Sequence, residues 1–322
     1  MYTEISFPSL GLTMNPPRSI EIGSISIYYY GILIALGMGL AVLYASRRSK
    51  EFGIKEDHLL DAVLWVTPFA IICARAYYCA FTWESYAANP ISVLDIRSGG
   101  LAIYGGVIGA AVGVTVFCRR RKISLPALLD LCALGFLIGQ SIGRWGNFFN
   151  REAFGAETAS FLRMGLMSAY SGKVTYYHPT FLYESLWNAA GFLLLHKLSQ
   201  KRKYDGQIAL SYAAWYGLGR TFIEGLRTDS LYLGPFRVSQ LLAAISCVAA
   251  VLVLALQMRK KHDSEDLYVN RVAAQEAAEA KEKEEKTEET SEETAEETAE
   301  VTEEAAEEAA EAAENTEGTS EE

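Results

Sequence analysis

The sequence predicts an all-α membrane protein with about seven transmembrane helices and an acidic tail that does not fold. Three observations support this fold class: seven apolar segments, a regular alternation of basic loops, and an abrupt change of composition near residue 262. We therefore expect a membrane domain over residues 1–262 and a low-complexity tail over residues 263–322.

The apolar segments are long enough to cross a bilayer, which takes about 17–25 residues of helix. We expect spans at residues 25–46, 59–81, 100–118, 126–143, 180–196, 207–225 and 238–258. The first and the last are the clearest. Asp61 and Arg75 interrupt the second, and Arg220 and Glu224 interrupt the sixth. The alternative is a soluble helical protein whose apolar helices are buried in a core.

Basic residues cluster after the first, third, fifth and seventh segments, and they are sparser after the second, fourth and sixth. Cytoplasmic loops of membrane proteins carry an excess of Lys and Arg. The alternation therefore predicts an odd number of spans, with the N-terminus outside and the C-terminus in the cytoplasm.

The tail has the opposite charge to the rest of the chain. Residues 263–322 hold 24 Asp and Glu against 4 Lys and Arg, a net charge of −20, whereas the whole chain carries −10. After Val272 the tail has almost no large apolar side chains, so it cannot bury enough surface to fold alone. We expect a disordered cytoplasmic tail. Because the basic residues lie in short clusters between apolar spans, we expect no nucleic-acid partner.

One polar segment follows the fourth apolar run. It reads Gly-Arg-Trp-Gly-Asn-Phe-Phe-Asn-Arg-Glu-Ala-Phe-Gly and spans residues 143–155. Charge so close to hydrocarbon is costly and is usually functional. The topology places this segment in an outer loop over residues 143–179.

A second polar group lies within the sixth apolar run. Tyr216, Arg220, Glu224 and Arg227 recur at helical spacing, which puts all four on one face. Arg220 and Glu224 are four residues apart and can form a local ion pair. A pair that serves only structure is the alternative.

Arg144 and Arg220 come from different helices and can reach one pocket. Guanidinium groups bind phosphate oxygens in pairs and stay charged. At this depth the most abundant phosphate belongs to a lipid head group, so the site suggests binding of, or chemistry on, a phospholipid. A transporter or flippase for an anionic lipid, and a phospholipase-like hydrolase, are the alternatives. No phosphate-cradling loop or zinc-binding helix motif is present, and we expect no metal or cofactor.

Three segments together resemble the bacterial prolipoprotein diacylglyceryl transferases. They are residues 143–155, the Tyr-Gly-x-x-Arg-x-x-x-Glu-x-x-Arg stripe from Tyr216, and the His-Pro-Thr-x-Leu-Tyr-Glu segment from His178. The resemblance covers about residues 20–258. It implies a multi-pass enzyme of the bacterial inner (plasma) membrane. Such an enzyme moves the diacylglyceryl group of phosphatidylglycerol to the lipobox cysteine of a preprolipoprotein, forms a thioether and releases glycerol 1-phosphate.

The resemblance also implies roles for the polar residues. Arg144 and Arg220 would grip the phosphate, and Glu152 and Glu224 would orient the arginines or accept the thiol proton. Further substrate-binding or supporting roles fall to Asn147, Tyr30, Tyr216, Arg227, Gly155 and His178. Of these, Gly155 would serve the loop backbone, and His178 would be either a base or a residue of the helix start.

Tyr104 marks a departure from the family. Many members carry a histidine, proposed as the general base, before the Gly-Gly pair at residues 105–106. A phenol with an ordinary pKa near 10 is a poor base at neutral pH. We expect Tyr104 to hydrogen-bond the substrate while another group takes the proton.

Overall fold

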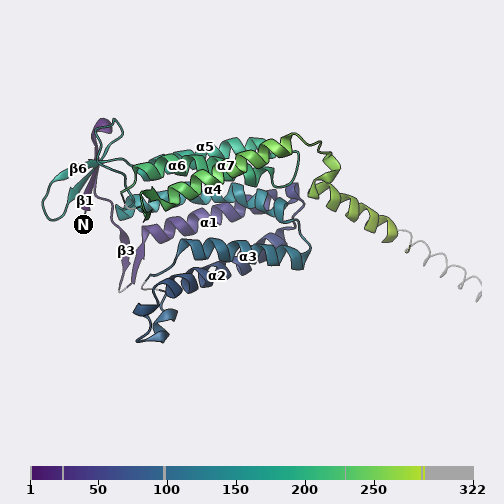
Figure 1. Ribbon diagram of the computed structural model, residues 1–322, viewed down its shortest axis with the longest axis horizontal. Coiled ribbons are helices and arrows are strands. Elements are labelled where there is room, and N and C mark those ends of the chain that lie inside the picture. The colour runs from purple at the N-terminus through teal and green to yellow at the C-terminus, as the bar shows by residue number, and fades with distance from the viewer. Residues whose placement is uncertain (1, 24, 97–98, 229, 284–285, 287–322) are drawn as a thin grey trace, which may run out of the picture. The chain divides into compact units, whose positions relative to one another are not determined.

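The computed structural model describes residues 2–23, 25–96, 99–228, 230–283 and 286 (Figure 1). The chain divides into two compact units, Met1–Val269 and Asn270–Glu322. The first unit contains all seven long helices and all the strands. Its fold is described here, because it holds the polar residues singled out from the sequence.

Seven long helices make up most of the first unit, and they lie side by side (Figure 1). They are α1 (Tyr29–Arg48), α2 (Glu56–Phe81), α3 (Ile103–Arg121), α4 (Leu125–Asn150), α5 (Thr180–Ser199), α6 (Gln207–Leu226) and α7 (Val238–Met258). Each overlaps one of the seven segments expected from the sequence. In the described part of the chain, five are long and apolar enough to cross a membrane. The remaining two, α5 and α6, carry buried carboxylates at Glu184 and Glu224.

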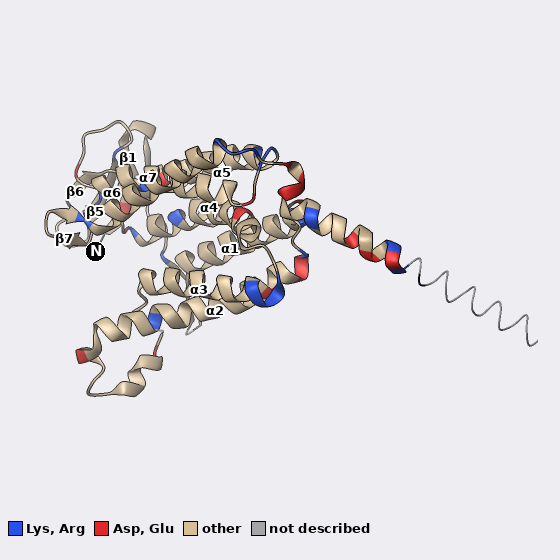
Figure 2. Ribbon diagram, turned by 45° about the vertical axis from the view of Figure 1, so that its right-hand side comes forward, with Lys and Arg blue, Asp and Glu red and all other residues tan. Residues whose placement is uncertain are grey.

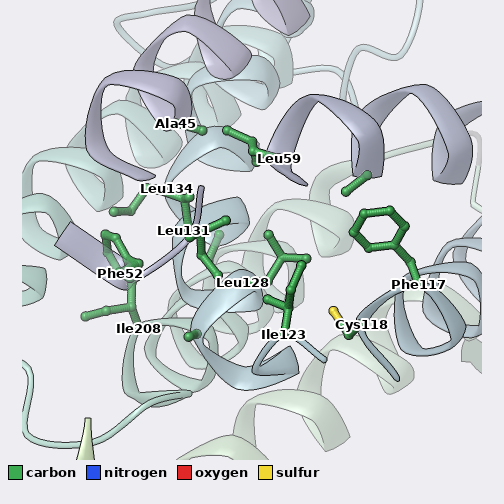
Figure 3. Close-up of a cluster of buried hydrophobic side chains, with 14 of the residues drawn as sticks. Ala45, Phe52, Leu59, Phe117, Cys118, Ile123, Leu128, Leu131, Leu134 and Ile208 are labelled. Atoms are coloured by element: carbon green, nitrogen blue, oxygen red, sulfur yellow. The ribbon is translucent and has the colours of Figure 1, made fainter. Parts of the chain in front are cut away.

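Helix α4 is the centre of the packing. It contacts α1, α5 and α6, while α2 pairs with α3 and α6 pairs with α7. A cluster of fully buried side chains surrounds the first half of α4, with Leu131 and Leu134 of α4 meeting Phe52 and Ile208 (Figure 3). Burying side chains of this size stabilises a fold by about 1.5–3 kcal/mol each.

Polar contacts fix the ends of α4 and α6 at this core. The Ser124 hydroxyl accepts a hydrogen bond from the Ala127 N–H and caps the start of α4. The Asp130 carboxylate, fully buried on α4, accepts bonds of 2.8 Å from the N–H groups of Gly206 and Ala209. Asp130 therefore satisfies free N–H groups in the first turn of α6 and holds the two helices in register.

The expectation of an all-α fold needs a correction, because short strands form outside the helices. A four-stranded antiparallel sheet has the order β2-β1-β5-β6. Its strands are β1 (Tyr2–Phe7), β2 (Leu12–Met14), β5 (Met164–Ser168) and β6 (Val174–Tyr177). Ile5 and Leu166 pair across β1 and β5 and are both fully buried. Ile5, Met164 and Leu166 form one buried cluster with Phe148 and Phe181, so the sheet buries apolar side chains against the helices.

Two hairpins complete the strands. β3 (Ser19–Ile22) pairs with β4 (Ile25–Tyr28), and β7 (Tyr232–Leu233) pairs with β8 (Phe236–Arg237). β4 leads directly into α1, and β8 leads directly into α7. The labelled strands β1, β3 and β6 lie at one end of the helices (Figure 1).

The expected outer loop at residues 143–179 also needs a correction. Helix α4 continues through the first part of that segment to Asn150, and Arg151 ends it in the left-handed conformation with φ of 56°. Phe148 is buried in a second apolar cluster with Phe181 and Leu166, so this last stretch of α4 has a core to pack against. The arginine at position 144 therefore projects from a helix.

The tail is helical where the structure describes it. A 3-10 turn covers Ser264–Asp266, and residues 268–283 are α-helical. The expectation of disorder is therefore wrong for this part, because alanine and glutamate are strong helix formers. The expectation for residues 284–285 and 287–322 lies outside the described residues.

Lys and Arg residues gather at the helix ends farther from the strands (Figure 2). These ends join the loops that carry the basic clusters in the sequence. The two ends of the bundle therefore differ in charge, as the sequence pattern indicates.

Candidate active site

Five charged side chains meet near the strand end of the bundle, on α4, α5 and α6 and just beyond. Glu184 of α5 is the centre. Its Oε2 lies 2.5 Å from Arg144 Nη2, and its Oε1 lies 3.0 Å from Arg220 Nη1 and 3.6 Å from Arg227 Nη1. Glu184 is 4% exposed, so these contacts are shielded from water. One carboxylate thus contacts Arg144 of α4 together with Arg220 of α6 and Arg227 at the end of α6.

Glu224 completes the cluster. Its Oε2 lies 2.5 Å from Arg220 Nη2 and 3.8 Å from Arg227 Nε, and its Oε1 accepts a hydrogen bond of 2.9 Å from the Ser230 hydroxyl. The local ion pair between Arg220 and Glu224 is the one that their spacing indicates. The ion cluster, defined as Arg144, Glu184, Arg220, Glu224 and Arg227, has three cations and two anions.

The surplus positive charge matters for ligand choice. Buried charges need partners, and the five groups by themselves hold three guanidinium groups and two carboxylates. A site this rich in arginine suits an anionic ligand. The phosphodiester group of a phospholipid carries one negative charge and offers oxygens that guanidinium groups bind in pairs.

Both carboxylates also keep one oxygen with spare capacity. Glu184 Oε2 and Glu224 Oε2 are buried and touch arginines, yet neither accepts a hydrogen bond of good geometry. Each oxygen can therefore still accept a proton or a donor from a substrate.

A cavity of about 470 Å³ opens beside Arg144. It lies between α1, α2 and α4, and most of its lining is apolar. Its polar side chains include Gln140, Arg144 and Asn147, which lie three or four residues apart on one face of α4. Tyr30 joins them from α1. A long apolar space with a guanidinium and amides toward one end has the polarity of a lipid with a charged head.

Tyr30 is held in place by a close helix contact. A Cβ atom on Gly146 would lie 2.6 Å from Cδ2 of the Tyr30 ring, so only glycine lets the ring lie against α4 at this position. This contact keeps the start of α1 against the last turns of α4, where Arg144 and Asn147 face the cavity.

Gly155 positions Arg227 through the backbone. The Gly155 N–H donates to the His178 carbonyl at 2.9 Å, and Gly155 forms an antiparallel bridge with Arg227. A Cβ atom at Gly155 would lie 2.7 Å from His178 Cβ and 2.9 Å from the Leu226 carbonyl oxygen. The role expected for Gly155 in the loop backbone agrees with this close approach.

Arg151 takes a different part from Arg144. It is 6% exposed, and its Nη2 donates to Thr3 O, Asn15 Oδ1 and Pro16 O at 3.1, 2.8 and 2.7 Å. Burial, and then the charge of Arg18, lowers the pKa of Arg151, although a guanidinium remains protonated. Arg151 ties the N-terminal strands to the end of α4.

In the described part of the chain Glu152 forms no ion pair with an arginine, and the expectation that it orients one stays a prediction. Its Oε1 accepts hydrogen bonds from Asn147 Nδ2 at 3.1 Å and from Asn150 Nδ2 at 3.0 Å. The left-handed turn at Arg151 reverses the chain and points Glu152 back at α4. Glu152 is exposed and acts on Asn147, which lines the cavity.

Three other expected residues lie outside the ion cluster. Tyr104 is in the first turn of α3, which packs mainly on α2. The His178 ring faces the Tyr183 hydroxyl, with Nδ1 at 3.3 Å. Tyr216 lines a small pocket with Glu184 and Arg220, and its ring stacks on Tyr212. Of these three, only Tyr216 lies beside a residue of the ion cluster.

Glu184 is the functional residue that sequence reasoning left off the site. It belongs to the His178–Glu184 segment, but nothing in its own helix marks it as a centre. A carboxylate within an apolar helix was the available signal, because intramembrane acids are rare and usually paired. In the described residues, no group of three or more His, Cys, Asp and Glu side chains is placed to hold a metal ion.

Comparison with known proteins identifies the family that this sequence matches. The family model described as prolipoprotein diacylglyceryl transferase matches residues 17–256. A phosphatidylglycerol–prolipoprotein diacylglyceryl transferase of Bacillus cytotoxicus is 42% identical over 260 residues, which is 79% of this chain and 96% of the relative. Proteins of the same name from Bacillus cereus and Bacillus anthracis are 43% and 44% identical over 257 residues, with 95% and 94% of each relative covered.

Proposed function

The chain belongs to the prolipoprotein diacylglyceryl transferase family, and from this we propose that it transfers the diacylglyceryl group of phosphatidylglycerol to a prolipoprotein. The acceptor is the cysteine thiol of a lipobox. The products are a thioether-linked lipoprotein precursor and glycerol 1-phosphate. The observation that carries this function is the convergence of Arg144, Arg220 and Arg227 on Glu184, with Arg144 also facing an apolar cavity.

We propose that the enzyme spans a bacterial inner (plasma) membrane seven times. Five helices meet the length and apolarity of a span by themselves. Helices α5 and α6 are each 20 residues long, and their carboxylates are covered by neighbouring arginines. Since paired charges face the inside of such bundles, both helices can also cross. The basic helix ends would be cytoplasmic, and the ion cluster would face outside.

The apolar cavity would receive the lipid. Its volume of about 470 Å³ lies within the range of about 300–1,000 Å³ typical of small-molecule sites. An acyl chain would follow the apolar lining of α1 and α4, and the phosphate would lie at Arg144, within reach of Asn147. Arg220 and Arg227 reach the same phosphate once it displaces the arginine contacts of Glu184.

The transfer needs a thiolate and a stabilised leaving group. The sulfur attacks the glycerol carbon that carries the phosphate ester, so a C–S bond forms as the C–O bond breaks. The leaving oxygen takes the electron pair, and the phosphate gains negative charge. Cations already placed around that oxygen stabilise the transition state more than the ground state.

The proton of the thiol must go to a base. We assign this role to the buried carboxylate of Glu184, which would take the proton as its ion pairs with the arginines give way to the phosphate. Protonation of Glu184 removes one anion and raises the net charge of the ion cluster from one positive charge to two. The leaving group at that moment approaches a dianion. The positive charge that the ion cluster gains on proton transfer therefore equals the negative charge that the leaving phosphate gains.

Arg144→Ala and Arg220→Ala test the assignment of the clamp. Each variant should lose transfer by about 10²–10³-fold, as loss of one transition-state donor does. The assay mixes purified protein with labelled phosphatidylglycerol and a lipobox peptide, and it measures glycerol phosphate. Membrane abundance of each variant is measured in parallel, and exposed Arg119→Ala is the matched control. Near-normal activity in a clamp variant would remove that arginine from the site.

The same assay separates the alternatives. Release of glycerol phosphate only with a cysteine-containing peptide supports transfer, and a serine-substituted peptide is the control. Release without peptide indicates hydrolysis, and absence of turnover with retained lipid binding indicates transport.

A further inference from the structure

A second groove lies on the other side of α1 from the active-site cavity. It has a volume of about 510 Å³, and α1, α4 and α5 line it. Most of its lining is apolar, with Leu40, Leu43, Leu137, Ile138, Phe192 and Leu193 as the larger side chains. Among the described residues, the groove and the cavity share none of their lining. We call this site the α1–α5 groove.

The α1–α5 groove is polar toward one end. On α1 its lining runs through Leu40, Leu43, Tyr44 and Arg47, which fall on one helical face. From Leu40 to Arg47 the helix rises about 10 Å. Arg47 is therefore the charged terminus of an apolar channel that ends near the last turn of α1.

Arg47 and its neighbour Arg48 differ in what they contact. Arg48 is 7% exposed, and its guanidinium donates to Glu51, Tyr44 and Ser199 at 3.0, 2.7 and 3.0 Å. Arg47 is exposed, and within the described part of the chain it makes no ion pair. The guanidinium of Arg48 is thus bound by other residues of the fold, whereas the guanidinium of Arg47 can bind an external anion.

The α1–α5 groove is open along its side. Leu43 and Leu193, on opposite walls, are 45% and 62% exposed. In a membrane-spanning bundle such a side opening faces lipid chains. A groove that is apolar along its length and cationic at its end has the polarity of an anionic phospholipid, with a chain along α4 and a phosphate at the guanidinium.

The charged ends of the two sites lie at opposite ends of the bundle. α1 and α4 run antiparallel, because Tyr30 at the start of α1 contacts Gly146 near the end of α4, and Ala41 contacts Gly135 near the middle of α4. Arg144 and Asn147 are therefore near the start of α1, whereas Arg47 is near its end. Head groups bound at Arg144 and at Arg47 must belong to opposite leaflets.

We propose that the α1–α5 groove is a binding site for an anionic phospholipid of the leaflet opposite to the active site, with its phosphate on Arg47. The site is separate from the transfer reaction and does not depend on it. It holds a lipid that is bound and not consumed.

Photocrosslinking tests the site directly. Full-length protein in phosphatidylcholine nanodiscs receives trace phosphatidic acid with a photoreactive group in one acyl chain, and a phosphatidylcholine probe with the same chain is the reference. Labelled peptides are mapped by mass spectrometry. The phosphatidic acid probe should label the α1 and α5 walls several-fold more than the reference.

Two variants give the expected losses. Arg47→Ala should reduce labelling of the groove by phosphatidic acid about fivefold, the effect of one interfacial basic residue. Ala189→Phe should fill the groove and abolish labelling by both probes there. Exposed Arg119→Ala, outside the groove, is the charge control, and Arg144→Ala is the active-site control. Neither control should change groove labelling.

Equal labelling of the walls by the two probes would mean ordinary boundary lipid and would overturn the proposal. Unchanged labelling in Arg47→Ala would overturn it as well, and since Arg47 is exposed this variant is expected to fold. A fall in groove labelling in Arg144→Ala would show that the probe reports the active site. Transfer activity of Arg47→Ala, measured separately, reports on the proposed reaction alone.

Discussion

Glu184→Gln should destabilise the folded protein strongly although it removes no atom of bulk. The substitution keeps the shape of the side chain and removes one of the two anions that face three arginines. The net charge of the ion cluster rises from one to two positive charges. Glu184 is 4% exposed and its arginine partners are at most 22% exposed, so water screens little of the repulsion.

The magnitude follows from what a buried ion pair loses when one partner is removed. Such changes cost about 3–5 kcal/mol, because the remaining charge stays buried without compensation. For a chain of this size, each kcal/mol lowers the midpoint of thermal unfolding by about 2–4 °C. Glu184→Gln should therefore lower the midpoint by about 10 °C. The assay heats detergent-solubilised protein and measures the fraction that remains monodisperse by size-exclusion fluorescence.

Two further variants make this prediction sharp. Glu84→Gln removes an exposed carboxylate and should shift the midpoint by less than about 2 °C, the range of a surface substitution. The double variant with Glu184→Gln and Arg144→Gln removes one charge of each sign, so it should recover part of the lost stability through coupling between the two sites. If Glu184→Gln unfolds with the midpoint of Glu84→Gln, the ion cluster does not hold α4, α5 and α6 together.

Other predictions concern three further positions. Gly155→Ala should reduce transfer at least tenfold, because the added Cβ atom would displace His178 or the backbone before Arg227. Gly39 has open space around it, so Gly39→Ala should leave transfer unchanged in the same assay. Tyr104→Phe should lose at most about tenfold in kcat/KM with an unchanged pH profile, the effect of one hydrogen bond. Loss of the rise in activity with increasing pH would make Tyr104 the proton acceptor. Tyr268→Ala should lower the unfolding midpoint by about 2–4 °C, because a half-buried ring contributes about 1 kcal/mol to the core; an unchanged midpoint would show that residues near the end of the first unit do not brace it.

The helices could be predicted because their signal is local. Each apolar run in the sequence corresponds to one long helix, and the pairing of Arg220 with Glu224 follows from a spacing of four residues. Local geometry fixes such contacts whatever the rest of the fold does. The same holds for the shared face of α4 that presents Arg144 and Asn147 to the cavity.

The strands were missed because their partners are distant in the sequence. β1 pairs with β5 across about 160 residues, and Ile5 is buried in a cluster with Leu166, Phe148 and Phe181. A strand of this length has no helical period to detect, and its stability depends on a neighbour that the local sequence does not specify. The length and apolarity of the helical segments can therefore be recognised from the sequence alone, whereas these short strands cannot.

Glu184 and Glu152 show that distance along the sequence does not predict which charged side chains meet. Glu152 is close to Arg144 in sequence, but the left-handed residue between α4 and the following segment turns its carboxylate to Asn147 and Asn150. Glu184 lies 40 residues from Arg144 and 36 from Arg220, yet it touches both. Proximity along the chain suggested Glu152 as the partner of Arg144. The packing of α5 against α4 and α6 makes Glu184 the partner instead.

The two arginines of the 143–155 segment now have separate reasons to be there. Arg144 lies one helical turn from Asn147 and shares its face, so its guanidinium reaches both the cavity and Glu184. Arg151 stands after the last turn of α4, where a left-handed backbone directs it to the carbonyls of Thr3 and Pro16. Carbonyl and amide oxygens accept the hydrogen bonds of its Nη groups, so Arg151 draws no carboxylate from the ion cluster. Glu184 and Glu224 therefore remain shared among Arg144, Arg220 and Arg227.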